Sequence, residues 1–463
     1  MAGAHPISCD PDATLRSAAL VAGLAPLAIL GAPAFGRRTG AVRALVAVAV
    51  GGFLLSAYAI FARARFGALL YGRIAVPTVS PFGPFVNKNH FAGWSAMAAL
   101  LVAGLVLGLA ERARGRGRDW TTGPGAGGVV SALVAALAMA LAVLTSLSRG
   151  GTIALGSGAV CLLALVAVRG RTEKGRARLA PSLALAGVLA AVLFTLAPSE
   201  AQERLQSLSG ASFRLDTWRD ATRMTLASPA VGVGLGAFHD AYPRFKRGQG
   251  FVRVEHAEND YLETVAETGL LGLSLALAAG GGLIAGAGRG LSKASDRVVR
   301  GIGLGAIAGL AALAVHSAVD FDLRIPSNAA LAAVLASAAA GVVGPRSRPL
   351  GRAAAAALAL AAAGLAAGVL ALPVQPWLAA REEARLAVTA ASPASRALRL
   401  ERAEAACIAL LRRRPAHAES WLMLAGIRAA RGDRASGPAL ARHAVLLDPQ
   451  RLELREAAAR LER

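Results

Sequence analysis

Long apolar runs separated by short polar connections occupy the chain from its N-terminus to about residue 372. A helix made from a run of this length crosses the roughly 30 Å hydrocarbon core of a bilayer. We predict ten spans, at residues 15–34, 42–62, 91–110, 128–147, 152–168, 179–197, 263–288, 301–319, 327–344 and 353–372. The pattern predicts an all-α fold, a polytopic membrane helix bundle over residues 1–372, with a long connection at 198–262 and a small helical domain at 373–463.

Basic residues are concentrated in alternate connections between these spans. One set holds nineteen lysines and arginines, at 35–43, 111–127, 169–178, 289–300 and 345–352, and the other short connections hold six, at 63–90, 148–151 and 320–326. Basic loops stay in the cytoplasm, so residues 198–262 and the tail are predicted to be external. The same alternation places the N-terminus outside, which indicates a missing upstream helix or a misassigned first span.

The composition excludes an ordinary soluble domain. Of the 463 residues, 55% are apolar, and the mean hydropathy is positive. The formal net charge of +22 does not indicate a nucleic-acid partner, because most of the arginines lie in the short connections. The three cysteines, Cys9, Cys161 and Cys407, lack disulfide or metal-ligand spacing. No basic segment precedes the first apolar run, so we expect no cleaved signal peptide.

The segment at residues 256–272, HAENDYLETVAETGLLG, places an imidazole and several carboxylates at the entrance of the seventh span. Asn259 can cap a helix whose first turns carry acids, which suit the positive end of a helix. His256, Asp260, Glu263 and Glu267 are spaced three or four apart, so a helix would hold them on one face. The alternative interpretation is a capped, solvated entry to a membrane helix.

This segment resembles the signature of the O-antigen ligase and polymerase family, which are integral membrane glycosyltransferases. Members commonly show His-x-His-Asn, then a hydrophobic helix start, then Gly-x-x-Gly. The positions that fit are Asn259, Tyr261, Leu262, Glu263, Gly269 and Gly272. Glu258 replaces the second histidine, which is the candidate catalytic group of the ligases. The resemblance therefore implies Glu258 as the catalytic base, with His256 as its orienting partner or the second choice.

Two further elements of the membrane region resemble the family. Asn87-x-Asn89-His90-Phe-Ala-Gly opens the third span, and Ser-Arg149-Gly-Gly precedes the fifth. The resemblance implies that both asparagines contact substrate and that Arg149 binds phosphate. The alternatives are an asparagine cap for the helix and an arginine that reaches the membrane surface.

The long connection contains a predicted amphipathic helix that ends near Leu226, in which Arg214, Trp218 and Arg219 lie within about one turn of one another. It is followed by Pro-x-x-Gly-x-Gly-x-Gly-x-Phe at 229–238, which resembles a family turn. This glycine spacing is not a dinucleotide fingerprint, because no strand precedes it. We expect a flexible turn laid over the membrane surface.

His316-x-x-x-Asp320-Phe-Asp322 follows the eighth span. An Asp-x-Asp pair suggests the metal site of a nucleotide-sugar enzyme, but nucleotide sugars are not normally supplied on the predicted external side. A similar stretch occurs in the family, so we assign Asp320 a structural or pocket-lining role and predict no metal.

After Pro373 the chain becomes polar and rich in arginine. Pro415 and Pro449 are 34 residues apart, and Trp421, Leu424 and Ala444 fall at offsets that resemble a tetratricopeptide repeat. Residues 384–449 would form about two repeats, with 450–463 as a capping helix. Two repeats are few for an independent solenoid, so we expect them to pack on the membrane domain or on a partner.

The resemblance implies a metal-independent glycosyltransferase without a cofactor, on the external face of the bacterial inner membrane. It would transfer or polymerise a polyprenyl-pyrophosphate-linked oligosaccharide onto a glycan or lipid acceptor. Arginine binds pyrophosphate oxygens bidentately, so Arg149, Arg214 and Arg219 are predicted to bind the substrate. The resemblance adds Asn259 to these substrate-binding residues. Glu258 and the tail favour a polymerase over a ligase. A transporter or an assembly scaffold is the alternative of another class, although nearly charge-free spans count against transport.

Overall fold

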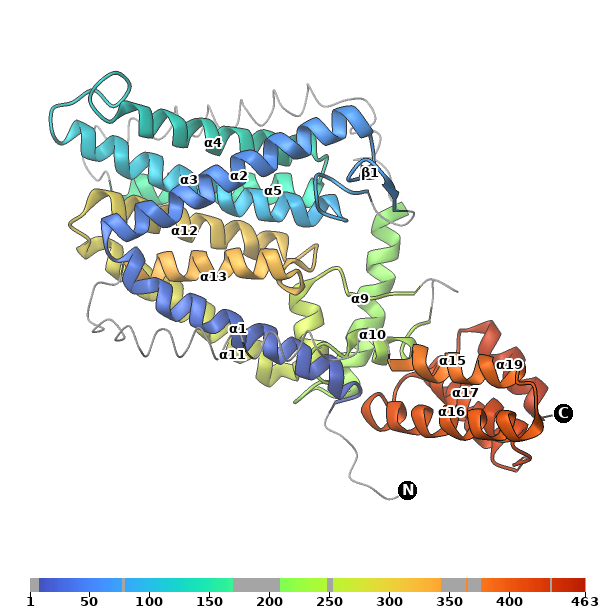
Figure 1. The fold of residues 1–463 in the computed structure, drawn as a ribbon. Coiled ribbons are helices and arrows are strands. Elements are labelled where there is room, and N and C mark those ends of the chain that lie inside the picture. The colour runs from blue at the N-terminus through green and yellow to red at the C-terminus, as the bar shows by residue number, and fades with distance from the viewer. Residues whose placement is uncertain are drawn as a thin grey trace. The chain divides into compact units, whose positions relative to one another are not determined.

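The computed structural model describes residues 8–76, 80–169, 209–247, 253–342, 364, 376–433 and 435–462. These residues are almost entirely helical, with one small pair of strands, β1 (Leu69–Leu70) and β2 (Ile74–Ala75), in the connection after the second helix (Figure 1). The predicted all-α class is confirmed.

Seven of the described helices are long and apolar enough to cross a membrane. They are α1 (Pro11–Phe35), α2 (Arg38–Phe66), α3 (Lys88–Arg114), α4 (Ala126–Thr145), α5 (Arg149–Arg169), α11 (Asp260–Lys293) and α12 (Arg297–His316). They correspond to seven of the ten predicted spans, and they make the chain a multi-pass membrane protein. The predicted span at 327–344 is α13 (Pro326–Gly341), which at 16 residues is a little short for a span. The predicted spans at 179–197 and 353–372 lie outside the described residues.

The chain divides into two compact units. One contains residues 22–207 and 276–362, and the other contains residues 1–21, 208–275 and 363–463. We call them the membrane unit and the surface unit. The names follow the apolar helices of the first and the polar connection and tail of the second.

The core of the membrane unit is the contact between α3 and α12. Both helices are largely buried, and glycines let their backbones touch. A Cβ at Gly104 would lie 2.4 Å from the carbonyl oxygen of Gly301, and a Cβ at Gly108 would lie 2.8 Å from that of Arg297. Small residues allow this approach between membrane helices. Large apolar side chains of α2, α4 and α5, such as Leu54, Leu137 and Ile153, are exposed, which suits a surface covered by lipid.

The surface unit combines the long connection with the tail. The connection contains α9 (Ser209–Ala227), α10 (Phe238–Ala241), the short 3₁₀ helix η1 (Tyr242–Arg244) and the start of α11. The tail contains α15 (Pro376–Val388), α16 (Pro393–Arg413), α17 (Ala418–Ala430), α18 (Gly437–Leu447) and α19 (Leu452–Glu462). Consecutive tail helices pack against each other. Arg414, which follows α16, pairs with Asp240 at 2.7 Å and with Asp10 at 3.1 Å, so the tail is tied to the connection by a shared cation.

The glycine-rich turn is anchored to α11, which differs from the flexible cover expected from the sequence. Gly269 has a φ of +65° inside α11, and the helix is interrupted there. The amide of Leu270 donates to the carbonyl of Pro229 at 2.8 Å, and the amide of Gly234 donates to the carbonyl of Glu267 at 2.8 Å. A Cβ at Gly269 would lie 2.2 Å from backbone atoms of Ala230. The glycines of the turn at 229–238 and Gly269 of α11 therefore allow these two segments to pack backbone against backbone.

Candidate active site

A constrained turn precedes α11 and carries both predicted catalytic residues. Residues 253–257 lack helical structure, α11 begins at Asp260, and Glu258 has a φ of +54°. A left-handed conformation is uncommon for a residue other than glycine and is maintained by its surroundings. His256 therefore precedes the helix, unlike the prediction of one helical face shared with the acids. The turn directs the side chains of His256 and Glu258 to different partners.

His256 is bound by a buried carboxylate. Its Nδ1 lies 2.9 Å from Glu263 Oε1, and the other oxygen of Glu263 accepts the amide of Ala257 at 2.8 Å. Glu263 is only 1% exposed. An ionised Glu263 holds the proton on Nδ1 and leaves Nε2 as the basic nitrogen, which is the arrangement required of an imidazole general base.

Helix α9 supports the same turn from the other side. Arg214 Nη2 donates to Glu258 Oε2 at 3.1 Å, and Trp218 Nε1 donates to the carbonyl of Ala257 at 2.9 Å. Arg214 and Glu258 are partly exposed, so a ligand can reach the pair. The predicted amphipathic helix is present, and it brings Arg214 to the turn. Arg219 instead pairs with Asp216 at 3.2 Å on the exposed side of α9.

The acids at the start of α11 are not solvated. Asp260, Glu263 and Glu267 are at most 2% exposed, and Glu267 accepts the amide of Phe238 at 3.2 Å. The alternative of a solvated helix entry is therefore wrong, although the predicted cap is correct. Asn259 Oδ1 accepts the amides of Tyr261 and Leu262 at 3.0 Å.

The remaining predicted site residues lie in the membrane unit. Asn87 caps α3 by accepting the amide of Asn89 at 2.9 Å, which agrees with the alternative interpretation of that motif. Arg149 is exposed at the start of α5. The two motifs are joined by Lys88, whose Nζ donates to the carbonyl of Leu147 at 2.9 Å.

Asp320 belongs to a buried group at the ends of α3, α12 and α13. It is 1% exposed and lies 3.4 Å from His90 and 3.7 Å from His316. His316 Nδ1 also contacts Asp322, and the Asn328 side chain donates to Asp322 at 2.8 Å. The sequence motifs contained His90 and His316, but their spacing of more than 200 residues gave no signal that they meet.

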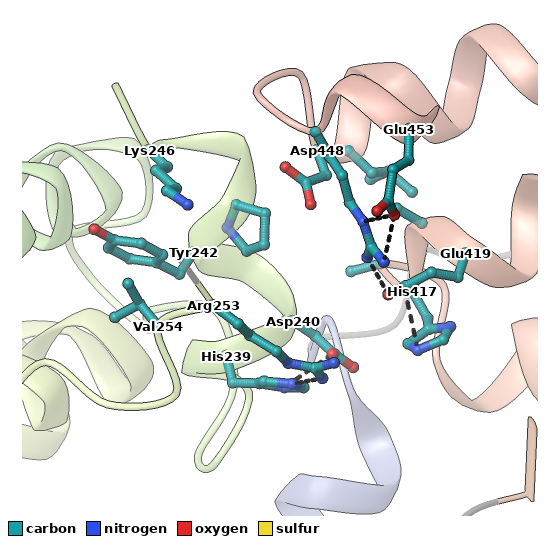
Figure 2. A pocket seen from close by; sticks show the side chains of 15 residues that line it. His239, Asp240, Tyr242, Lys246, Arg253, Val254, His417, Glu419, Asp448 and Glu453 are labelled. Atoms are coloured by element: carbon teal, nitrogen blue, oxygen red, sulfur yellow. Dashed lines mark hydrogen bonds and ion pairs between the residues drawn. The ribbon is translucent and has the colours of Figure 1, made fainter. Parts of the chain in front are cut away.

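A polar cavity of about 210 Å³ lies inside the surface unit, between the connection and the tail. Figure 2 shows Lys246 and Tyr242 on the side of the connection, and Asp448, Glu453 and His417 on the side of the tail. The lining also includes His239, Asp240, Arg253, Glu419 and Arg451. Charges of both signs suit a hydroxyl-rich or charged ligand and not a lipid chain.

Burial and charge shift several pKa values around this cavity. Burial lowers the pKa of Lys246 and of His417, and it raises the pKa of Asp448. Burial also acts to raise the pKa of Asp240, but hydrogen bonding to His239 and the charge of Arg414 outweigh it and hold that pKa below the usual range. Burial raises the pKa of Asp10 to about 6, because Ala13 and Arg414 only partly offset it.

Comparison with known proteins agrees with the motifs. A family model described as O-antigen ligase matches residues 133–277. This range includes Arg149, α9, the glycine-rich turn and the His256 turn. No curated protein matches the chain.

Proposed function

We propose that this chain, whose residues 133–277 match a family model described as O-antigen ligase, transfers an oligosaccharide from a polyprenyl pyrophosphate to a glycan or lipid acceptor. The family supports a ligase or polymerase type of function in envelope polysaccharide biosynthesis. The finer proposal concerns the donor, the catalytic residues and the side of the membrane on which they act.

The pairing of His256 with buried Glu263 is the observation that carries the mechanism. An acceptor hydroxyl would attack the anomeric carbon, its proton would pass to His256 Nε2, and the bond from that carbon to the pyrophosphate oxygen would break. The geometry favours His256 over Glu258 as the base, because Glu258 is already engaged by a guanidinium at 3.1 Å. A positioned base of this kind contributes about 10²–10⁴-fold to a rate.

Arg214 is the proposed partner of the departing pyrophosphate. Glu258 holds its guanidinium beside the turn, and because a guanidinium has five N–H donors, it can bind a pyrophosphate oxygen while it keeps its bond to Glu258. Arg149, which is exposed at the start of α5, is proposed as a second phosphate ligand. Preplaced positive charge stabilises the charge that develops on the leaving group, so this transfer step would need no metal ion.

The polar cavity of the surface unit is the proposed place for the growing glycan. Its mixed charges and its position beside residues 253–254, shortly before His256 in the chain, support binding of a saccharide. Processive addition of repeat units needs such a second glycan site, which favours a polymerase over a ligase that acts on a lipid acceptor. The helical tail, proposed to be tetratricopeptide-like, is also available to other polysaccharide-assembly proteins.

The surface unit is proposed to face the periplasm of the bacterial inner membrane. The support is the distribution of basic residues, nineteen against six, between alternate connections. Labelling single cysteines with an impermeant reagent tests this, with Ser228→Cys in the surface unit and Ser292→Cys in the basic connection 289–300. In intact spheroplasts we expect the reagent to label position 228 and not position 292. Labelling of position 292 and not of position 228 would contradict the predicted topology.

The test of the mechanism is transfer by purified full-length protein from a lipid-linked oligosaccharide. We expect His256→Gln to abolish transfer and Glu258→Gln to weaken donor binding. If His256→Gln is active and Glu258→Gln is inactive at saturating donor, Glu258 is the base. A non-enzymatic assembly scaffold is the second candidate, supported by the tail, and it would keep its cellular function after His256→Gln.

A further inference from the structure

In the buried group of the membrane unit, both carboxylate oxygens of Asp322 have partners. Asp322 Oδ2 contacts His316 Nδ1, and Asp322 Oδ1 accepts from Asn328 Nδ2 at 2.8 Å. The same Asn328 nitrogen also donates to the carbonyl of His90 at 2.8 Å. Asp322 therefore holds the ring of His316 in one orientation, and Asn328 links this pair to the start of α3.

The atoms that face each other next to this pair are farther apart than the roughly 2.7–3.2 Å of normal hydrogen bonds. His90 Nε2 lies 3.4 Å from Asp320 Oδ1, and His316 Nε2 lies 3.7 Å from Asp320 Oδ2. Within the described residues, His90 Nε2 and Asp320 Oδ2 are buried and have no hydrogen-bond partner. A buried polar atom without a partner costs about 1–3 kcal/mol. Two such atoms on neighbouring side chains indicate a bound group that contacts both side chains.

These separations match those of atoms that share a metal ion. Two ligands about 2.0–2.1 Å from a tetrahedral zinc ion lie roughly 3.3–3.4 Å apart. One ligand atom from each of His316, Asp320 and Asp322 falls within 4.8 Å of the others, and His90 adds a second imidazole from α3. A histidine that binds a metal commonly donates its other ring N–H to a carboxylate, which is what His316 offers to Asp322.

We propose that His90, His316 and Asp320 bind one divalent transition-metal ion, for which zinc is the best match, and that Asp322 orients His316 as an outer-shell partner. Two imidazoles and a carboxylate are typical zinc ligands. The ion would be bound by residues other than those assigned to the transfer chemistry, so the proposal goes beyond the proposed function.

The expected role of the ion is to join three segments that are distant in sequence. His90 lies in the Asn87–Gly93 motif, and Gly150, next to Arg149, packs against His316. A Cβ at Gly150 would lie 3.0 Å from His316 Nε2, and a Cβ at Gly93 would lie 2.2 Å from Asp322 Oδ2. An ion at this point would fix the backbone that presents Arg149 relative to the starts of α3 and α13.

Metal content of the purified full-length protein tests the proposal. The protein carries an affinity tag without histidine, is purified without chelator and is analysed by mass spectrometry for metals. We expect about one zinc ion per chain, its loss in Asp320→Asn, and roughly 10–100-fold weaker zinc binding in Asp322→Asn. Replacement by cobalt should give visible absorption bands of a tetrahedral site that are absent from Asp320→Asn.

His256→Gln is the control that separates this proposal from the proposed function, because it should lose transfer and keep the metal. The wild-type protein also provides a test that does not depend on the folding of a variant, since chelation should lower its melting temperature and zinc should restore it. A monodisperse wild-type protein that stays well below one ion per chain after incubation with zinc and cobalt would overturn the proposal. So would equal cobalt spectra in the wild type and Asp320→Asn. The group would then be a network of ion pairs only.

Discussion

Replacing Glu263 by glutamine should change the tautomer of His256 while the turn keeps its hydrogen bond from Ala257. Glu263 is 1% exposed and accepts two hydrogen bonds, from Ala257 N at 2.8 Å and from His256 Nδ1 at 2.9 Å. In Glu263→Gln, the amide oxygen can keep the bond from Ala257. The NH₂ group then faces Nδ1 and favours the tautomer in which Nε2 carries the proton. That tautomer cannot accept a proton from the acceptor hydroxyl.

The expected effect follows from the role of a positioned base. General base catalysis contributes about 10²–10⁴-fold, which corresponds to about 3–5 kcal/mol of transition-state stabilisation. We expect Glu263→Gln to lower kcat by this factor and to change KM for the donor little, because Arg214 is unaffected. The assay is single-turnover transfer from a lipid-linked oligosaccharide, measured between about pH 5 and 8. The wild-type rate should fall on the acid side, where an imidazole base becomes protonated.

Glu267 provides the matched control. It lies one helical turn further along α11, it is also 1% exposed, and it accepts one backbone N–H, from Phe238 at 3.2 Å. Glu267→Gln should therefore affect stability as much as Glu263→Gln, with far less effect on kcat. Equal losses of kcat in the two variants, or a fully active Glu263→Gln protein, would refute the assignment of His256 as the base.

Three further predictions follow from single contacts. Arg214→Lys should not restore wild-type transfer, because an ammonium supplies charge without the planar fork, and KM for the donor measures this. Gly269→Ala should lower the free energy of unfolding in detergent by about 1–3 kcal/mol, because φ is +65° and the added Cβ would lie 2.2 Å from Ala230. The control Gly281→Ala, with open space around it, should be neutral or stabilising. Arg414→Ala should lower the free energy of unfolding by about 3–5 kcal/mol, because it leaves the buried Asp240 carboxylate without its guanidinium partner, and limited proteolysis of the tail measures the loss. The folded-state pKa of Asp240 lies below its unfolded value, so its stabilising contribution should be complete above about pH 4 and decrease as the pH falls.

The sequence alone determined the fold class and the local elements of the site. Apolar runs of about twenty residues have few alternatives to membrane helices, because a backbone in hydrocarbon must satisfy its hydrogen bonds internally. The cap at Asn259 and the helix that ends near Leu226 were also predictable, since both depend on interactions between residues close in sequence. The family resemblance rested on motifs of the same local kind.

The tertiary structure decided which side chains meet. Nothing local indicates that Glu258 adopts a left-handed conformation, which sends it to Arg214 and leaves His256 to Glu263. The burial of Asp260, Glu263 and Glu267 likewise depends on the glycine-rich turn and α9 packing over the start of α11. His90 and His316 come together only because α3 and α12 pack through glycines along their length. Contacts between distant segments depend on packing, which the spacing of residues along one segment does not encode.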